Sequence, residues 1–406
     1  MAPTWREGKR VAVIGCGPGG VSTALALIRQ GFDVRIYERQ AEPKAIGGAV
    51  LLSVPVLAIL RSYGIDVSNF GLPTVTHFKN RRGKDRVILP FNRLVEEKMG
   101  INGWHYGVLR SSAFRQMLEL LPEGVILPGH DFARYEETDS GVTVHFQNGQ
   151  SVQADMIVGA DGIRSGVSRQ MFGDPGLFHV GIRLWLAWCD HIEGVPPNYG
   201  FLSHDRRNQV SFFPMLHEGK PGFEWWVVEP ARENDPVPDD PRAHVGAIVR
   251  DWFDPIPRLF DATDFDTQVF RWEIYNRPSL KTWSLGRAVC VGDAVHPVSP
   301  YAAYGMGMAI EDGYFLAKFL AGTDLRDAVA MTRAFARYEA QRVDYVNGNV
   351  EFARKLGRIF HNMPAPLAVL RDLVFDHTPF LRKMVTKDQL DAAERETLAL
   401  SELHVG

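Results

Sequence analysis

Apolar and polar positions near the N-terminus predict a strand, a helix and a second strand. Val11 to Ile14 form a continuous apolar run, short enough for a buried parallel strand. Apolar residues then recur at helical spacing from Val21 to Ile28, and Gly31 follows as a helix C-cap. Asp33 to Tyr37 has the composition of another strand. This order is that of a βαβ unit, which begins a parallel sheet.

The remaining pattern divides into a β-rich middle and a helical end. From Phe178 to Arg271, aromatic residues and β-formers predict a mostly antiparallel sheet. A strand at Ala288 to Val291 precedes a helix from about Gly305 to Leu320. Three further helical stretches follow, at Leu325–Arg358, Pro364–Phe375 and Lys387–Glu402. The predicted fold class is therefore α/β, with a Rossmann-like nucleotide-binding domain, an inserted antiparallel sheet domain and a helical C-terminal part.

The segment between the first strand and helix contains G-x-G-x-x-G at Gly15, Gly17 and Gly20. The first glycine permits a tight turn, the second lets a pyrophosphate approach bare backbone, and the third lets helix and strand pack closely. Glu38 ends the second strand, where a carboxylate can accept hydrogen bonds from a ribose 2′-OH. The pattern predicts an adenine dinucleotide, FAD or NAD, with its pyrophosphate at the helix N-terminus. A glycine-rich loop that only packs is the alternative.

Composition argues against several other classes of protein. The 406 residues carry a net charge of −3, which gives no reason to expect nucleic acid or an acidic membrane surface as a partner. Cys16, Cys189 and Cys290 are far apart, so neither a metal site nor a disulfide framework is expected. No apolar run is long enough to span a bilayer. We therefore expect a cytoplasmic protein.

Two further motifs distinguish between the nucleotides. Val158 to Ser165 contains Asp161, and Gly292 to Pro297 contains Asp293. Together with the glycine motif and Arg110, they resemble the flavin-dependent aromatic hydroxylases, single-component monooxygenases with the p-hydroxybenzoate hydroxylase fold. The resemblance covers about residues 10 to 345. Taken singly, the two motifs have the alternatives of an ordinary turn and a helix N-cap.

The resemblance implies non-covalent FAD, with NADH or NADPH as a transient electron donor. Glu38 would bind the FAD ribose, and Arg110 would reach the pyrophosphate and ribityl region. Asp161 would contact FAD and NAD(P)H near the pyrophosphate, and Asp293 would hold the ribityl chain. The helix that begins near Gly305 would direct its unpaired N–H groups at the negative charge of the reduced ring. The residues expected to bind FAD are Gly15, Gly17, Pro18, Gly19, Gly20, Glu38, Arg39, Gly48, Arg110, Asp161, Asp293, Pro300, Gly305, Met306 and Gly307.

Three domains are expected. The FAD-binding domain would comprise residues 1–72, 98–175 and 276–325, and the substrate-binding sheet domain residues 73–97 and 176–275. Residues 326–406 would form the C-terminal helices. We expect these helices to pack on their own chain, with a cap over the substrate pocket or a homodimer contact as alternatives.

The activity that the resemblance implies is transfer of one oxygen atom from O2 to an aromatic ring through a peroxyflavin. Relatives that act on hydroxypyridines and hydroxybenzoates often carry a His and a Tyr four residues apart, which hold or deprotonate the phenol. Asn208 and Phe212 align with that pair, so it is missing here. The expected pocket is largely apolar, with plain core as the alternative for its aromatic members, and consists of Leu51, Trp185, Gln209, Phe212 and Phe213. We infer a phenolic or heteroaromatic substrate that has considerable apolar surface, or that is acidic enough to need no strong base.

Polar residues that could take part in catalysis are Tyr304, His204 and Arg183. Tyr304 precedes the flavin-facing helix and is expected to line the ring pocket, whereas a surface role is the alternative for the other two. His296 is expected to be structural. Two rival functions remain: another FAD oxidoreductase of this fold (an epoxidase, a Baeyer–Villiger-type oxygenase or a reductase), or a non-catalytic flavin-binding relative. The W-x-W-x-I-P motif of flavin halogenases is absent from the sequence.

Overall fold

The computed structural model describes residues 5–44, 47–89, 93–103, 105–302 and 304–385, together with 395 and 400. The chain forms two compact units, each assembled from three segments. Unit 1 consists of Met1–Ala45, Phe114–Phe178 and Asn276–Ala353, and unit 2 consists of Ile46–Ala113, His179–Tyr275 and Arg354–Gly406. Residues 46–72 and 98–113, which the predicted boundaries assign to the nucleotide-binding domain, belong to unit 2. The three-domain division itself stays a prediction.

Unit 1 is built on a six-stranded sheet with the order β17-β18-β11-β1-β2-β7. All neighbouring strands are parallel except β17, which pairs antiparallel with β18. The strands are β1 (Arg10–Ile14), β2 (Asp33–Glu38), β7 (Ile126–Pro128), β11 (Met156–Gly159), β17 (Ser284–Leu285) and β18 (Ala288–Cys290). Residues Val11 to Ile14 are at most 2% exposed, as expected for a strand in a parallel sheet that is covered on both faces.

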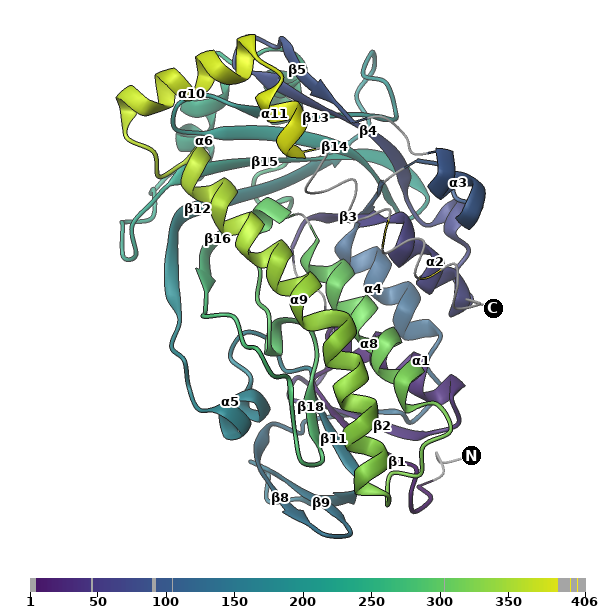
Figure 1. The fold of residues 1–406 in the computed structure, drawn as a ribbon. Coiled ribbons are helices and arrows are strands. Elements are labelled where there is room, and N and C mark those ends of the chain that lie inside the picture. The colour runs from purple at the N-terminus through teal and green to yellow at the C-terminus, as the bar shows by residue number, and fades with distance from the viewer. Residues whose placement is uncertain are drawn as a thin grey trace. The chain divides into compact units, whose positions relative to one another are not determined.

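Helices and a small antiparallel sheet complete unit 1. Figure 1 shows α1 and α8 side by side, and a Cβ added at Gly313 of α8 would lie 2.5 Å from the backbone nitrogen of Thr23 in α1. Glycine is therefore required for this close approach. The helices are α1 (Pro18–Arg29), α5 (Gly166–Phe172) and α8 (Gly305–Leu320), with short 3-10 turns η2 (Gly292–Ala294) and η3 (Pro300–Ala302). Two further helices, α4 (Arg110–Glu119) and α9 (Ala328–Phe360), have their larger parts in unit 1, while Arg110–Ala113 and Arg354–Phe360 belong to unit 2. The small sheet has the order β10-β9-β8, formed by β8 (Phe132–Thr138), β9 (Gly141–Phe146) and β10 (Ser151–Ala154).

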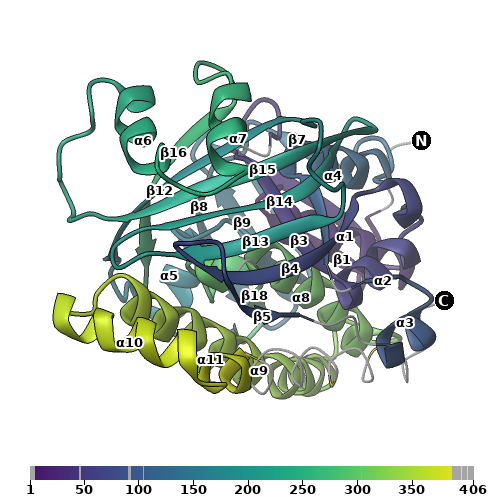
Figure 2. The same ribbon diagram turned by 90° about the horizontal axis from the view of Figure 1, so that it is seen from above.

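Unit 2 is built on a nine-stranded sheet with the order β16-β12-β15-β14-β13-β4-β6-β3, in which β5 also pairs with β4. The strands are β3 (Ala49–Ser53), β4 (Leu72–Asn80), β5 (Asp85–Ile88), β6 (His105–Leu109), β12 (Phe178–Asp190), β13 (Tyr199–His204), β14 (Gln209–His217), β15 (Lys220–Pro230) and β16 (Val269–Asn276). Helices α6 (Pro241–Val249) and α7 (Ile256–Ala262) lie over one face of this sheet (Figure 2). Their apolar side chains join those of β12, β14 and β15 in one core.

The other helices of unit 2 are α2 (Val54–Ser62), α3 (Arg93–Met99), α10 (Ala365–His377) and α11 (Phe380–Val385), with the 3-10 turn η1 (Val67–Asn69). The predicted helices near Leu325–Arg358 and Pro364–Phe375 correspond to α9 and α10. The predicted helix Lys387–Glu402 lies outside the described residues, apart from positions 395 and 400. Within the described part of the chain, none of the helices combines the length and the apolar character needed to cross a membrane.

Candidate functional site

The glycine segment connects β1 to α1, and its three motif glycines have different surroundings. Gly15 has φ +100°, and an added Cβ would lie 2.5 Å from the carbonyl oxygen of Ala160. A Cβ at Gly20 would lie 2.1 Å from the carbonyl oxygen of Gly15. A Cβ at Gly17, in contrast, would meet no protein atom within 4 Å. The first and third glycines therefore serve packing, whereas the second leaves open space where a pyrophosphate can approach the backbone.

Glu38, at the end of β2, reaches back to this loop. The backbone N–H of Cys16 donates to Glu38 Oε2 at 2.8 Å, and that of Gln40 donates to Oε1 at 2.8 Å. Each carboxylate oxygen keeps further acceptor capacity, which suits ribose hydroxyls. Helix α1 begins at Pro18 without a side-chain cap, so its first N–H groups and dipole favour an anion. Loop, helix start and carboxylate together fit the adenosine diphosphate half of FAD.

The Asp161 motif lies directly beside the glycine loop, because β11 pairs with β1 and both strands end at the same edge. The Asp161 carboxylate accepts hydrogen bonds from the Ser165 hydroxyl at 2.5 Å and from the Gly166 N–H at 2.7 Å. Burial raises the pKa of Asp161, although these hydrogen bonds oppose the shift. The side chain thus stabilises the turn into α5, which is the structural role weighed as an alternative, and it does so next to the glycine loop.

The Asp293 motif joins the same edge of the sheet through β18, which pairs with β11. Gly292 follows β18 with φ +60°, and its N–H donates to Asp312 Oδ2 at 2.9 Å. Asp293 itself is exposed within η2. Helix α8 begins at Gly305 without a side-chain cap. Three segments far apart in the sequence therefore meet within unit 1 at the carboxyl ends of parallel strands, where open α/β sheets bind their ligands.

A buried charge network underlies the segment between β18 and α8. His296 Nε2 lies 2.5 Å from Asp312 Oδ2, and Arg342 Nε donates to Asp312 Oδ1 at 2.9 Å. Arg342 also donates to Glu311 at 2.8 Å, and the Tyr304 hydroxyl donates to the same carboxylate. Burial by itself would raise the pKa of Asp312, but His296 and Arg342 outweigh it and the pKa is lowered. His296 therefore has the surroundings of a structural residue, and the Tyr304 hydroxyl is engaged with Glu311.

In unit 2 the nine-stranded sheet separates the predicted pocket residues onto two faces. Trp185 and Phe212 are 2% and 1% exposed and belong to the core covered by α6 and α7. Phe213 follows Phe212 on β14 and therefore points to the opposite face, where it clusters with Leu51. Gln209 shares the strand parity of Phe213 and donates to the Ser211 hydroxyl at 3.1 Å. The structure thus places Trp185 and Phe212 in plain core, away from the other three.

The backbone at Gly47 and Gly48 is closely surrounded by side chains of unit 2. A Cβ at Gly47 would lie 2.6 Å from the Trp272 ring, and the Arg110 guanidinium lies over that ring at 5.1 Å. The Arg110 N–H donates to the Gly48 carbonyl at 3.2 Å. On the other side of Gly48 lies the carboxyl group of Glu224, which the sequence reasoning missed. Its only signal in the sequence was a single charge inside the apolar strand that contains Trp225 and Trp226.

Arg183 and His204, predicted as catalytic, have other partners. Arg183 donates to Glu273 Oε1 at 2.7 Å and to the Asp235 carbonyl at 3.0 Å. His204 stacks on Phe360 with ring centroids 3.8 Å apart. Burial keeps the pKa of His204 well below its ordinary value. The structure does not bring these two side chains together in one constellation, and their catalytic roles stay predictions.

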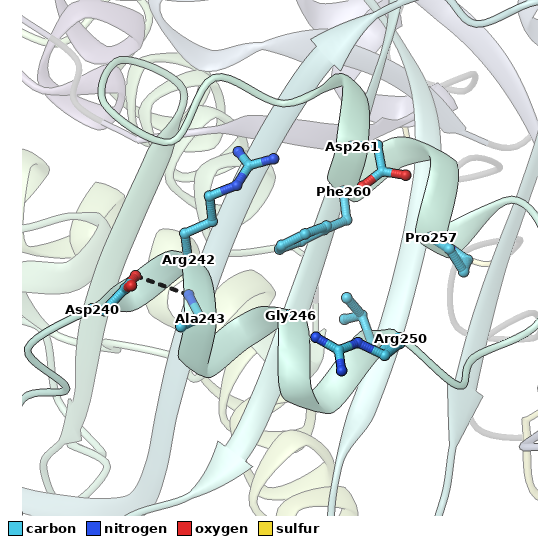
Figure 3. Close-up of a pocket in the computed structure, with 9 residues that line it drawn as sticks. Asp240, Arg242, Ala243, Gly246, Arg250, Pro257, Phe260 and Asp261 are labelled. Atoms are coloured by element: carbon cyan, nitrogen blue, oxygen red, sulfur yellow. Dashed lines mark hydrogen bonds between the residues drawn. The ribbon is translucent and has the colours of Figure 1, made fainter.

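A pocket of about 420 Å³ lies between α6 and α7 (Figure 3). Arg242 and Phe260 line it, and the Arg242 guanidinium lies over the Phe260 ring at 5.1 Å. Asp240, also in the lining, caps α6 by accepting a hydrogen bond from the Ala243 N–H at 2.9 Å. None of the predicted site residues lines this pocket.

Comparison with known families identifies the protein class. The profile of the family described as FAD binding domain matches residues 9–353 of this chain. The chain belongs to this FAD-binding family. It is 30% identical over 394 residues to a 3-amino-4-hydroxybenzoate 2-monooxygenase of Streptomyces platensis, with 94% of each chain covered. It is 29% identical to a 6-hydroxynicotinate 3-monooxygenase of Pseudomonas fluorescens, over 88% of this chain and 91% of the relative.

A solved structure similar to this chain gives the same result. A variant of HpxO from Klebsiella pneumoniae, complexed with FAD, superposes with a TM-score of 0.81 and 26% identity, over 93% of this chain and 98% of that one. A second structure of HpxO contains FAD and uric acid. The predicted α/β fold, the FAD cofactor and the class of FAD-dependent aromatic monooxygenase are confirmed. Among the residues that the structure describes, no group of acidic, histidine and cysteine side chains could hold a metal ion.

Proposed function

We propose that this FAD-dependent monooxygenase inserts one oxygen atom from O2 into a phenolic or heteroaromatic ring that carries considerable apolar surface. The observation that supports this substrate class is the face of the unit 2 sheet that α6 and α7 leave uncovered. There, Leu51, Trp188 and Trp226 are partly exposed and pack against the Phe213 cluster. Partly exposed tryptophans on an apolar face suit a flat aromatic ligand. NADH or NADPH would be the transient electron donor.

Different residues of unit 1 would bind different parts of FAD. Gly17 would admit the pyrophosphate, the start of α1 would neutralise it, and Glu38 would accept hydrogen bonds from the ribose. Exposed Asp293 would hold the ribityl chain. When bound, FAD would store the electrons from NAD(P)H and activate O2. Gly48 and Arg110 belong to unit 2, and their binding of FAD stays a prediction.

The beginning of α8 would stabilise negative charge on the reduced flavin ring. No side chain caps this helix, so its first N–H groups, near Gly305 to Gly307, keep their donor capacity. A helix N-terminus aimed at developing charge acts as a fixed electrostatic stabiliser. Tyr304 would lie beside the ring as an aromatic wall, because its hydroxyl already bonds to Glu311.

The relatives act on small rings that carry hydroxyl groups, as their names state for 3-amino-4-hydroxybenzoate and 6-hydroxynicotinate. We expect the substrate here to share the hydroxylated ring and to carry more apolar surface. Cytoplasmic localisation and a homodimer through the C-terminal helices stay predictions.

The test uses the purified protein loaded with FAD. NADH and NADPH oxidation is followed with phenols, hydroxypyridines, quinolones and larger polyketide-like aromatics, and products are analysed after reaction under ¹⁸O₂. We expect apolar phenols to stimulate oxidation more than hydroxypyridines do, with one labelled oxygen atom in the product. Product without the label would favour a reductase. A protein that stays colourless with added FAD would favour a non-catalytic relative.

A further inference from the structure

Glu224 is a buried carboxyl group on the face of the unit 2 sheet opposite α6 and α7. It lies on β15, opposite Trp188 on β12 and Phe213 on β14. The residue is 1% exposed. Its Oε2 accepts a hydrogen bond from the Ala49 N–H at 2.6 Å. A Cβ at Gly48 would lie 2.2 Å from Oε2 and 2.3 Å from Oε1, so the carboxyl group occupies the space that only a glycine leaves open.

The second oxygen of Glu224 is one of several buried side-chain polar atoms that lack a hydrogen-bond partner among the described residues. In the part of the chain that the structure describes, Oε1 has no hydrogen-bond partner. Glu229, five residues later on the same strand but on the face covered by α6, has both oxygens engaged, Oε1 with Trp185 and Oε2 with His244. Buried polar atoms are nearly always hydrogen-bonded, so an unpaired carboxyl oxygen beside partly exposed aromatics points to a ligand partner.

The electrostatic surroundings of Glu224 favour its protonated form. Burial raises the pKa of this carboxyl group to about 8, while the Ala49 N–H and the charge of Arg110 oppose the shift. The side chains beside it on the same face, Trp188 and Phe213, carry no charge. A carboxyl group with a pKa near the working pH is well matched to exchange a proton with a phenol.

We propose that Glu224 is the acid–base residue for the aromatic substrate, with Oε1 accepting the hydrogen bond and then the proton of the ring hydroxyl. The inference rests on the proposed function. In the step, the substrate O–H bond breaks, an O–H bond forms on Oε1, and the electron pair stays on the ring oxygen. The proton leaves for solvent later in the cycle. A ring bearing an oxyanion is more electron-rich and accepts oxygen more readily. Glu224 would thus replace the His and Tyr pair whose positions Asn208 and Phe212 occupy.

A purely structural role is the competing explanation, with Glu224 holding the backbone at Ala49 and Gly48. Glu224→Gln separates the two, because a glutamine oxygen still accepts from the Ala49 N–H but cannot take a proton. Glu229→Gln is the matched control on the same strand. The structural explanation predicts that Glu224→Gln behaves like the wild type in every ligand measurement.

The first experiment measures binding without turnover. Phenol and anisole, which lacks the hydroxyl hydrogen, are titrated into the FAD-loaded proteins at pH 7 and pH 9 while flavin absorbance is followed. Phenol stays protonated at pH 9, as a tyrosine side chain does, whereas Glu224 is then ionised. For the wild type and for Glu229→Gln, we expect the ratio of the anisole Kd to the phenol Kd to be about 10-fold higher at pH 9 than at pH 7. In Glu224→Gln this pH dependence should disappear. An unchanged dependence in Glu224→Gln, or none in the wild type, overturns the proposal.

The second experiment follows turnover of the most active phenol from the substrate panel. Wild-type kcat/KM should rise as the pH increases through about 8. In Glu224→Gln we expect kcat/KM to be roughly 10²- to 10⁴-fold lower and no longer to rise with pH. Labelled oxygen in the product, together with a wild-type pH profile in Glu224→Gln, would overturn this inference and leave the proposed function intact. Absence of labelled oxygen with every aromatic would instead overturn the proposed function.

Discussion

The backbone N–H of Cys16 donates a hydrogen bond to the carboxylate of Glu38 across 2.8 Å. This bond joins the glycine loop to the end of the neighbouring strand and holds the carboxylate beside the loop, where we propose that the FAD ribose binds. Burial, with a smaller contribution from Glu38, also raises the pKa of the Cys16 thiol to about 12. Cys16 is therefore a neutral packing residue, and Glu38 is the group of this pair that is available to a ligand.

Replacing Glu38 with alanine should weaken FAD binding. The substitution removes the acceptor for the ribose hydroxyls and leaves the Cys16 and Gln40 N–H groups without their partner. Hydrogen bonds to charged groups contribute about 1.5–3 kcal/mol, so we expect Kd to rise roughly 10- to 100-fold. Titration of the apoprotein with FAD, followed by flavin fluorescence, measures this. Glu42→Ala removes an exposed carboxylate nearby and should leave Kd unchanged. Equal Kd values for the two variants would contradict the role of Glu38.

Alanine at Gly17 and at Gly20 should have opposite effects on ligand binding and folding. Gly17 has φ −79° and open space around an added Cβ, so Gly17→Ala should fold normally. The new methyl group would stand in the path of the pyrophosphate, and we expect FAD affinity to fall about 100-fold.

Gly20→Ala should instead destabilise the fold, because its Cβ would overlap the Gly15 carbonyl oxygen. Overpacking of this kind costs about 1–3 kcal/mol. Thermal unfolding of the two apoproteins distinguishes the cases. A lower melting temperature for Gly17→Ala than for Gly20→Ala would show that the open space beside Gly17 is misassigned.

Arg342→Met should be strongly destabilising, because it leaves the buried carboxylates of Glu311 and Asp312 without their guanidinium partner. Removing one member of a buried ion pair costs about 3–5 kcal/mol. Thermal unfolding should show a melting temperature several degrees below that of the wild type. Arg337→Met, at an exposed position of the same helix α9, is the control and should have the melting temperature of the wild type. Coincident unfolding of both variants would contradict a stabilising role for this network.

Glu224 should make the stability of the protein fall as pH rises. In the unfolded chain its carboxyl group ionises near 4.5, whereas in the folded protein the pKa is about 8. Between these values the folded state binds the extra proton, so unfolding becomes easier with increasing pH, by about 1.4 kcal/mol per pH unit. Glu224→Gln cannot ionise, and the difference in melting temperature between it and the wild type should therefore grow from pH 5 to pH 8. A difference that stays constant over this range would mean that Glu224 ionises normally.

The nucleotide-binding end of the molecule could be predicted from sequence because its signals are local. The turn at Gly15, the helix start after Gly17 and the carboxylate of Glu38 all follow from residues within one βαβ unit. The Asp161 and Asp293 motifs were predicted to join this end, and strand pairing of β11 with β1 and β18 brings them there. The local role of Asp161 in the turn into α5 was among the alternatives as well.

The nine-stranded sheet of unit 2 could not be predicted in the same detail. Phe212 and Phe213 look equivalent in the sequence, yet successive strand residues point to opposite faces, and only the position of α6 and α7 decides which face is covered. Arg183 and His204 were likewise predicted as catalytic residues, because the sequence does not show that Glu273 and Phe360, from distant segments, contact them.

The sequence by itself predicted an adenine dinucleotide, because short glycine and carboxylate motifs act through the backbone of a single turn, and the resemblance to the aromatic hydroxylases then indicated FAD and the class of chemistry. Tertiary structure alone decided the surroundings of Glu224, which lies 175 residues from Ala49 in the chain and meets it only through pairing of the sheet. Burial and an unsatisfied oxygen depend on which strands become neighbours, and strand neighbours are set by packing over the whole unit rather than by any local pattern.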